Sequence, residues 1–323
     1  MNVIQSDEPI ETRIVAIKAE IEEGPTKFKE LYRFLDQLKS SRNPIALSII
    51  LPMYNEEKTI RNVLNSLPSN DSIEIIVVND RSTDNSLAEI EIVQRYKPIN
   101  VINHSKNKGY GAAILSGVNQ AKGEIIVTMD SDGQHSPDDI VTLIRPIVEK
   151  EADYTIGSRY LGSYFYQLPV STRLGEVVLE KFIQILFHRR IKNNQNGFRA
   201  FNRKVISIFR DLKYEGYAFC TEQILKASLE GYKIKECPIK LYDRQFGVSH
   251  IILRKLAVNI FTCLFIYYLR KIQFMALKKN KAGVLKIQKS PKIYRPNKKS
   301  VTYEGLIQCN SFIFIERKNI PSA

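Results

Sequence analysis

The chain has 323 residues, of which 44% are apolar and 25% are charged, and its net charge is +14. These proportions are ordinary for one large or two small globular domains and exclude wholesale disorder and a collagen-like chain. No apolar run reaches the roughly 20 residues of a spanning helix, which excludes a multi-span membrane protein.

The N-terminal segment is expected to form a helical appendage over residues 1–44 rather than a domain of its own. Residues 8–40 carry apolar side chains at helical spacing, and Gly24–Pro25 divides them into two short helices. The start, MNVIQSDEP, has neither a basic segment nor an apolar run, so no secretory signal is visible. Four widely spaced cysteines without a CxxC pair indicate a reducing compartment and no zinc site.

From residue 45 to residue 250 the pattern becomes one of alternating strands and helices. Apolar runs predict buried strands at 46–52, 73–79, 98–104, 124–130 and 154–158. Amphipathic stretches predict intervening helices at 56–67, 83–95, 109–121 and 138–150. This alternation predicts an α/β fold with a mostly parallel central sheet flanked by helices. Ligands of such sheets bind at the carboxyl ends of the strands.

Polar side chains follow four of these strands at the point where each strand ends. They are Pro52, Tyr54, Asn55, Glu56 and Glu57 after the first, Asn79, Asp80, Arg81, Ser82 and Asp84 after the second, Asp130, Ser131, Asp132, Gly133 and Gln134 after the fourth, and Ser158 and Arg159 after the fifth. Any one cluster could be helix capping. Four clusters on one edge of a sheet indicate a binding site.

The sequence Asp130-Ser131-Asp132 brings two carboxylates to one strand end. Hard cations such as Mg²⁺ and Mn²⁺ take such oxygen ligands and share them with substrate phosphates, so we expect a nucleoside diphosphate. A dinucleotide oxidoreductase is disfavoured, because the first strand is followed by PMYNEEKT without a GxGxxG turn. A P-loop is also missing.

The C-terminal part combines a predicted helix at 251–277 with a basic tail. Between Arg254–Lys255 and Arg270–Lys271 lie 14 residues, a helix of about 21 Å at ~1.5 Å per residue, which is too short for a ~30 Å hydrocarbon core. One side is apolar and suits a helix lying in a membrane surface, although a core helix or a subunit contact is the alternative. That side carries Leu256, Ile260, Phe261, Cys263, Leu264, Tyr267 and Tyr268.

Nearly all of the net positive charge lies in this part, since residues 251–323 hold 15 basic and 2 acidic side chains. Such a segment binds an anionic membrane face or nucleic acid. Regularly interleaved aromatic residues are missing, so we expect a membrane surface as the partner and no nucleic acid. Residues 278–323 are interpreted as a flexible tail, and the protein as peripheral at the cytoplasmic face of a membrane.

Eight motifs lie in a characteristic order between residues 47 and 250. They are SIILPMYNEEKTI (48–60), EIIVVNDRSTDNS (74–86), NKGYGAAILSG (107–117), VTMDSDGQHSPDDI (127–140), IGSRY (156–160), NGFRAF (196–201), FCTEQILKA (219–227) and DRQFGVSH (243–250). In order and spacing the chain resembles family 2 glycosyltransferases of the GT-A fold, the nucleotide-diphospho-sugar transferase fold. The likeness is greatest to polyprenyl-phosphate sugar transferases of the dolichol-phosphate mannose synthase type.

The resemblance implies a role for each matching residue. For the nucleotide sugar these are Pro52, Tyr54 and Glu56 in the pocket wall, Val78 and Asp80 at the base and ribose, Asp130, Ser131 and Asp132 at the diphosphate, and Arg159, Arg244 and His250 at phosphates. For the metal, Mg²⁺ or Mn²⁺, they are Asp130, Asp132 and Gln134; for the acceptor, Phe198 and Arg199; and for catalysis, Asp132, Arg159 and Glu222.

Four residues depart from the family pattern. Asn79 stands in place of an acid, Arg81 in place of a glycine, Asn193 in place of an acid and His250 in place of a lysine. Because a lysine neutralises phosphate and a histidine is mostly neutral at pH 7, the last change predicts weaker or pH-dependent nucleotide binding.

The resemblance predicts an inverting, metal-dependent transfer of a hexose from a nucleotide-diphosphate sugar, of the GDP-mannose or UDP-glucose type, to a polyprenyl phosphate. One alternative is a family 2 enzyme acting on a soluble glycan or a glycolipid. Another is a non-catalytic nucleotide-sugar binding protein. Neither the sugar, the base, the lipid nor the oligomeric state follows from the sequence.

Overall fold

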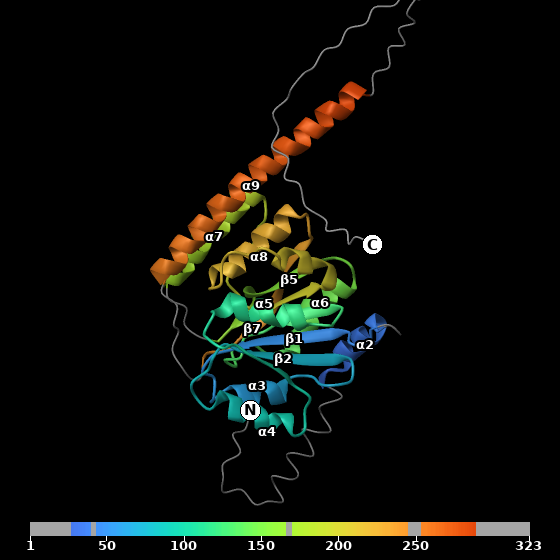
Figure 1. The fold of residues 1–323 in the computed structure, drawn as a ribbon, viewed down its shortest axis with the longest axis vertical. Helices are drawn as coiled ribbons and strands as arrows, with labels where there is room; N and C mark the ends of the chain where they lie inside the picture. The colour runs from blue at the N-terminus through green and yellow to red at the C-terminus, as the bar shows by residue number, and fades with distance from the viewer. Residues whose placement is uncertain (1–26, 40–42, 166–169, 245–252, 289–323) are drawn as a thin grey trace, which may run out of the picture. The chain divides into compact units, whose positions relative to one another are not determined.

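The computed structural model describes residues 27–39, 43–165, 170–244 and 253–288 (Figure 1). Its centre is one sheet of seven strands in the order β3-β2-β1-β4-β6-β5-β7. The strands are β1 (Leu47–Met53), β2 (Ile73–Asn79), β3 (Asn100–Asn103), β4 (Ile125–Thr128), β5 (Tyr154–Tyr164), β6 (Arg199–Asn202) and β7 (Ile234–Leu241). β6 runs antiparallel to both of its neighbours, and the other four pairings are parallel. The predicted mostly parallel sheet is confirmed.

Helices cover both faces of this sheet, because its strands are apolar on both sides. The helices are α2 (Lys29–Leu38), α3 (Ile60–Ser66), α4 (Ser86–Gln94), α5 (Tyr110–Gln120), α6 (Ile140–Val148), α7 (Val170–Phe187), α8 (Ala218–Leu229) and α9 (Leu253–Gln288). In β1, Ile49 and Leu51 pack into the cluster under α2, α3, α4 and α6, whereas Ile50 packs into the cluster under α5 and α8.

The predicted elements of the first half of the sheet are all present, with helix ends shifted by a few residues. β5 is longer than predicted, because it continues past Ser158 after an irregularity and pairs again with β7 at Ser163. No strand or helix is predicted from the sequence at α7, β6, α8 or β7. β6 has only four residues, and β7 alternates buried and exposed positions without a continuous apolar run.

The segment expected to be an N-terminal appendage contributes to the main core. Leu31, Phe34 and Leu35 of α2 are buried in the cluster that also holds the residues of β1 and α6. The first of the two helices predicted there falls in residues 1–26, outside the described residues.

The predicted C-terminal helix exists as α9 and extends beyond the expected end at residue 277. The apolar side of this helix is expected to lie in a membrane surface, with a core helix as the alternative. In the structure much of that side belongs to the core, because Ile260, Cys263, Leu264 and Tyr267 are buried against α7 and α8. Phe261 and Phe265 stay exposed. Among the described residues, no helix is long and apolar enough to cross a membrane.

The buried carboxylate of Glu222 connects α9 with α8 and the segment before it. Glu222 of α8 is fully buried and accepts hydrogen bonds from the backbone N–H groups of Lys213 and Tyr214 and, at 2.9 Å, from the hydroxyl of Tyr267. Burial without donors is costly for a carboxylate, so these bonds stabilise the junction.

We expect Tyr267→Phe to lower the free energy of unfolding by about 1.5–3 kcal/mol, because the variant removes a charge-assisted hydrogen bond from a buried acid. Chemical denaturation of the purified variant measures this loss. The matched control is Tyr268→Phe, which removes the hydroxyl of the neighbouring tyrosine, whose ring is only partly buried. An equal loss in both variants contradicts a specific role of the Tyr267 hydroxyl.

Candidate active site

The carboxyl ends of β1, β2 and β4 open into one large cavity of about 1260 Å³. It has a polar end and an apolar end, which differ in the elements that supply their side chains. The polar end is lined by Pro52, Tyr54, Glu56, Asp80, Asp130, Ser131, Asp132, Gln134, Arg159 and Arg244, and the apolar end by Leu174, Val178, Leu179, Leu256, Ile260 and Phe261 of α7 and α9. The predicted gathering of polar residues at this edge of the sheet is therefore observed.

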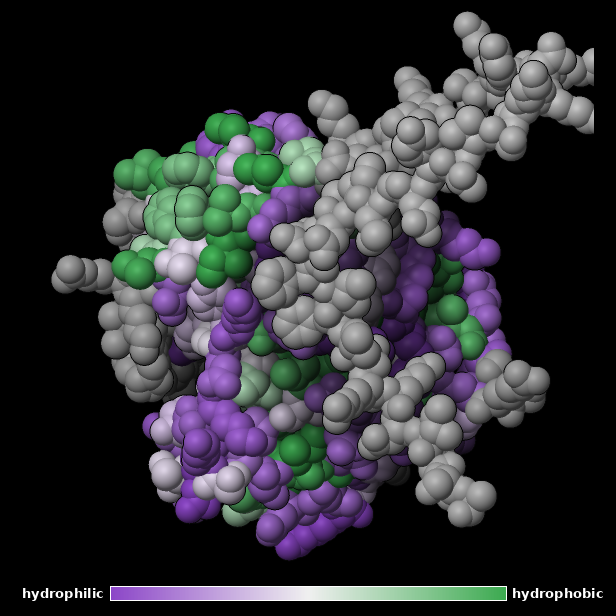
Figure 2. Space-filling model, turned by 45° about the horizontal axis from the view of Figure 1, so that its top comes forward, coloured by the Kyte–Doolittle hydropathy of each residue, from purple (hydrophilic) through white to green (hydrophobic). Residues whose placement is uncertain are grey.

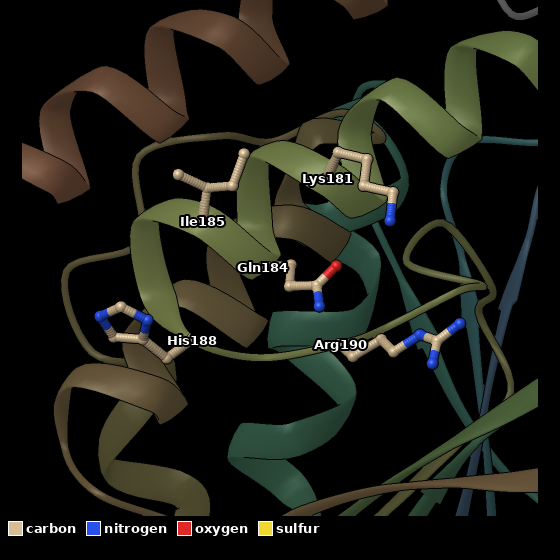
Figure 3. A pocket seen from close by; sticks show the side chains of 5 residues that line it. All are labelled: Lys181, Gln184, Ile185, His188 and Arg190. Atoms are coloured by element: carbon tan, nitrogen blue, oxygen red, sulfur yellow. The ribbon is translucent and has the colours of Figure 1, made fainter.

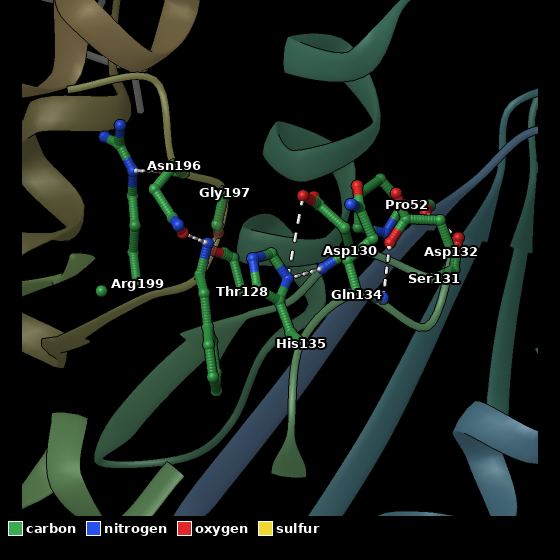
Figure 4. A network of polar contacts seen from close by, with 12 residues as sticks. Pro52, Thr128, Asp130, Ser131, Asp132, Gln134, His135, Asn196, Gly197 and Arg199 are labelled. Atoms are coloured by element: carbon green, nitrogen blue, oxygen red, sulfur yellow. Dashed lines mark hydrogen bonds and ion pairs between the residues drawn. The ribbon is translucent and has the colours of Figure 1, made fainter. Parts of the chain in front are cut away.

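The turn after β4 is fixed to the neighbouring strand ends by hydrogen bonds (Figure 4). The hydroxyl of Ser131 donates to the carbonyl of Pro52 at 2.8 Å, and the hydroxyl of Thr59 donates to the carbonyl of Ser131 at 2.9 Å. The backbone N–H of Gln134 donates to Asp132 at 3.1 Å. Both carboxylates of the motif are thus held on a rigid turn.

Asp130 is held among groups that crowd it on several sides. The ring of His135 lies 3.8 Å from its Oδ2 atom, and a Cβ added to Gly197 would come within 2.5 Å of its Oδ1 atom. Glycine is therefore required where the loop before β6 crosses this carboxyl group. Removal from bulk water raises the pKa of Asp130, with His135 opposing the shift and Asp132 adding to it.

Two arginines of the polar end are each paired with a carboxylate. Arg244 binds Asp132 at 2.7 Å, and Arg159 binds Glu176 of α7. Glu176 was not singled out from the sequence, because a single acid in a helix carries no motif. It lines the same cavity as Arg159.

Asp80 lines the cavity and also anchors the loop before α5. Its carboxylate accepts hydrogen bonds from the backbone N–H groups of Lys108 and Gly109 at 2.8 and 2.7 Å and lies 2.7 Å from the ring of His104. Gly109 has a φ of 94°, which favours glycine at this turn. The next residue after Asp80, Arg81, has a φ of 68°, so it keeps the left-handed turn that a glycine would adopt.

Four of the predicted site residues do not line the cavity. Val78 and Phe198 are buried in the core, and Glu222 binds the backbone and Tyr267 as described. Arg199 is also buried and donates to the carbonyls of Asn194, Asn196 and Cys220. Its neighbours Gln195, Asn196 and Gly197 line the cavity instead. His250 lies outside the described residues.

Sequence reasoning also missed two aromatic residues of the polar end. The rings of Tyr110 and Tyr217 stack with their centroids 5.4 Å apart, and both line the cavity. Tyr110 lies in the quoted NKGYG motif, which could have indicated it, whereas Tyr217 precedes a helix without a recognisable motif.

The side-chain oxygen atoms at the strand ends fit a divalent cation whose remaining coordination positions are filled by oxygen atoms of a bound substrate. Asp130 Oδ1 is buried and has no hydrogen-bond partner among the described residues, and Asp132 already binds a cationic side chain. The amide nitrogen of Gln134 donates to Tyr242, which leaves the amide oxygen as a possible ligand atom. No cluster of three or more His, Cys, Asp or Glu side chains that could hold a metal occurs in the described part of the chain. Mg²⁺ sites commonly use one or two carboxylates and substrate phosphates.

A second, open cavity of about 610 Å³ lies at the C-terminal end of α7 (Figure 3). It is lined by Lys181, Gln184, Ile185, His188 and Arg190. Arg190 pairs with Glu180 at 3.3 Å. The cavity has no carboxylate in its lining and is basic in character.

Comparison with known proteins gives the family. Residues 48–209 match the family described as Glycosyl transferase family 2. The chain belongs to this family, and it is a glycosyltransferase. The resemblance found in the sequence is thereby confirmed.

Two curated relatives each match a little under two thirds of this chain. The UDP-N-acetylglucosamine–dolichyl-phosphate N-acetylglucosaminyltransferase of Methanococcus voltae is 32% identical over 219 residues, which are 62% of this chain and 87% of that protein. The dolichol-phosphate mannosyltransferase of Pyrococcus furiosus is 29% identical over 217 residues, which are 64% of this chain and 59% of that protein.

Solved structures confirm the predicted GT-A fold. Glucosyl-3-phosphoglycerate synthase from Mycobacterium tuberculosis, in complex with Mn²⁺, UDP and phosphoglyceric acid, has a TM-score of 0.55 at 19% identity, over 69% of this chain and 78% of that chain. The same enzyme with Mg²⁺ and UDP has a TM-score of 0.56 at 18% identity, over 72% and 83% of the two chains.

Glu56, another acid of the polar end, has a raised pKa. Burial raises the pKa of Glu56 to about 7, with Asp132 and Asp130 adding to the shift and Thr59 and Arg244 opposing it. Between about pH 4.5 and pH 7 Glu56 is therefore protonated in the folded protein, whereas in the unfolded chain, with a pKa near 4.5, it has released this proton. Stability is unaffected by this group below pH 4.5 and falls as the pH rises toward 7.

We expect Glu56→Gln to gain thermal stability over the natural chain as the pH rises from 5 to 8, because glutamine cannot ionise. Melting temperatures of both proteins, recorded in a metal-free buffer with a chelator, measure the difference at each pH. If the melting temperatures of the two proteins change with pH in parallel over this range, the raised pKa is contradicted.

Proposed function

We propose that this chain transfers a sugar from a nucleotide-diphosphate sugar to a polyprenyl phosphate, with a divalent cation and with inversion at the anomeric carbon. The observation that carries this proposal is the single cavity with two chemically different ends. Carboxylates and arginines suit a diphosphate at one end, and aliphatic and aromatic side chains of α7 and α9 suit a prenyl chain at the other. The names of the two relatives from Methanococcus voltae and Pyrococcus furiosus add support, since both contain dolichyl phosphate or dolichol phosphate.

The polar end supplies the groups that such a reaction needs. Asp130 and Asp132 would hold Mg²⁺ or Mn²⁺, which would supply positive charge next to the departing diphosphate. Arg244, which pairs with Asp132 in the same cavity, would contact a phosphate of the donor. The bond from the anomeric carbon to the diphosphate breaks as the bond to the acceptor oxygen forms. A phosphate acceptor is already anionic at neutral pH, so no general base is required; with an alcohol acceptor Asp132 is the candidate base.

An exposed apolar surface next to the cavity suits attachment to a membrane. α7 exposes Leu174, Phe182 and Ile185, and α9 exposes Phe261 and Phe265. Figure 2 shows hydrophobic residues gathered at one end of the visible face. Exposed apolar side chains that gather on neighbouring helices mark an interaction site. The basic cavity beside Ile185 suits anionic headgroups.

The enzyme assay combines purified protein, Mn²⁺ or Mg²⁺, polyprenyl phosphate in detergent and labelled nucleotide sugars offered one at a time. We expect the label to move into the organic phase with one of them. Asp132→Asn should lower transfer about a hundredfold or more, because it removes a charge that holds the cation. The matched control is Asp138→Asn, an exposed acid of the same segment that pairs with Lys27.

Each other outcome of this assay identifies an alternative. Nucleotide release without a lipid product indicates a soluble glycan, a glycolipid or a small phosphorylated acceptor. Bound nucleotide without release indicates a non-catalytic binding protein. Full activity of Asp132→Asn contradicts the proposed metal site.

Attachment to the membrane is tested by sedimentation with vesicles of phosphatidylcholine and phosphatidylglycerol. We expect the double variant Ile185→Glu, Phe265→Glu to lose most vesicle binding, because both side chains are more than 60% exposed on the proposed face. Tyr96→Glu, at an equally exposed aromatic residue just after α4, is the control. Unchanged binding of the double variant contradicts this surface.

A further inference from the structure

The start of β6 lies between the two parts of the cavity that the proposed reaction connects. The sugar moves from a diphosphate at Asp130 and Asp132 to an acceptor whose chain lies along α7 and α9. β6 is the neighbour of β4 on the side away from β1, and its first residue, Arg199, pairs with Thr128 at the end of β4. The loop before β6, residues 194–197, therefore borders the space that the sugar has to occupy.

An aromatic ring faces this space. A Cβ added to Gly197 would come within 2.4 Å of the Tyr110 hydroxyl and 2.5 Å of Asp130, so both groups lie over the loop. The ring of Tyr217 stacks on Tyr110 with an angle of 16° between the two planes. One face of Tyr217 is thus covered by Tyr110, yet Tyr217 is 39% exposed and lines the cavity. Its uncovered part is available to a ligand beside Asp130.

An amide group lies at the edge of the same space. Asn196 is only 7% exposed and lines the cavity. Its side-chain oxygen accepts a hydrogen bond from the backbone N–H of Phe198 at 2.7 Å, which identifies the other amide atom as the nitrogen (Figure 4). This nitrogen has no hydrogen-bond partner in the part of the chain that the structure describes. Because buried amide groups normally have partners, an unused donor in a cavity wall points to a ligand.

One buried side chain fixes the amide and the ring relative to each other. Arg199 donates to the carbonyls of Asn194 and Asn196 at 2.6 and 2.7 Å. It also donates at 3.0 Å to the carbonyl of Cys220, which lies in the first turn of α8 just after Tyr217. The loop before β6 and the start of α8 are therefore held by the same guanidinium group.

We propose that Tyr217 and Asn196 bind the sugar of the donor substrate, with the Tyr217 ring against one face of the pyranose and the Asn196 amide nitrogen donating to one of its hydroxyl groups. This inference rests on the proposed function. A pyranose carries C–H groups on its faces and hydroxyl groups around its rim. The negative face of an aromatic ring attracts the weakly positive C–H groups, and an amide donates to a hydroxyl oxygen. A ring at one face and an amide at the rim fix the orientation of the sugar as well as its position.

Binding of matched probes without turnover tests this subsite. Calorimetry with the full chain, in Mg²⁺ and without an acceptor, compares UDP with UDP-N-acetylglucosamine and GDP with GDP-mannose. Within each pair the nucleotide is the same, so the ratio of the two affinities reports the sugar alone. Tyr217→Ala should lower the affinity for the nucleotide sugar about fivefold relative to the nucleoside diphosphate, because the aromatic contact is lost. Tyr217→Phe keeps the ring and should leave the ratio unchanged.

Asn196→Ala should lower the same ratio about threefold or more, because a hydrogen bond to the sugar is lost. Asn194→Ala is the matched control: it also removes one hydrogen bond of this loop, to Thr221 at 2.8 Å, but Asn194 does not line the cavity. Thermal unfolding checks that each variant is folded, and Tyr217→Leu replaces Tyr217→Ala if that variant is not. An unchanged ratio in the Tyr217 variant without a ring, or the same change in Tyr217→Phe, overturns the role of Tyr217. The same change in Asn194→Ala as in Asn196→Ala overturns the role of Asn196.

The transfer assay separates this inference from the proposed function. A natural chain that transfers sugar to lipid, while Tyr217→Ala and Asn196→Ala keep its binding ratio and its KM for the nucleotide sugar, contradicts the sugar subsite alone. A natural chain that binds a nucleotide sugar but makes no lipid product contradicts the proposed function, and the binding ratios still test the subsite. A natural chain that binds none of the four probes and transfers no sugar contradicts both.

Discussion

Every acid of the large cavity is partly removed from water, and the arrangement of the site depends on how each one is compensated. Asp80 is compensated by backbone N–H groups, Asp132 by Arg244, and Glu176 by Arg159 and Tyr160. Where the partners do not offset burial, the pKa of the carboxylate rises, as it does for Glu56 despite the Thr59 hydroxyl and for Asp130 despite His135. These two are therefore the acids that gain most when a ligand or a cation brings positive charge.

The first half of the sheet could be predicted because its strands are apolar on both faces and end in polar clusters. β1 and β2 have seven buried residues each, which leaves little ambiguity in the sequence. β6 has four residues and is defined by its antiparallel pairing with two strands, a contact between distant segments that a local pattern does not contain. The polar end of the cavity followed from the parallel strands, whereas its apolar end depends on the unpredicted α7.

Because local patterns do not contain contacts between distant segments, they also do not show which candidate residues line the cavity. Glu222 and Glu176 both belong to helices, and no local pattern distinguishes an acid that faces the cavity from one that is buried beneath Tyr267. Periodicity correctly predicted α9 as amphipathic but could not decide what its apolar side contacts. The structure divides that side: Cys263 and Leu264 pack against α7 and α8, and the neighbouring phenylalanines remain exposed.

Without ligands, both arginines of the polar end are neutralised by acids of the same cavity. An anionic ligand that binds these arginines therefore replaces one ion pair by another. Its binding free energy is the difference between the energies of the new and the old ion pair, which are similar. Such an exchange gives modest affinity, since each arginine must leave a partner in a region of low dielectric constant. It gives strong dependence on charge, because a ligand that carries more negative charge than a carboxylate gains on every exchange. A site of this kind distinguishes its ligands by charge more than by shape.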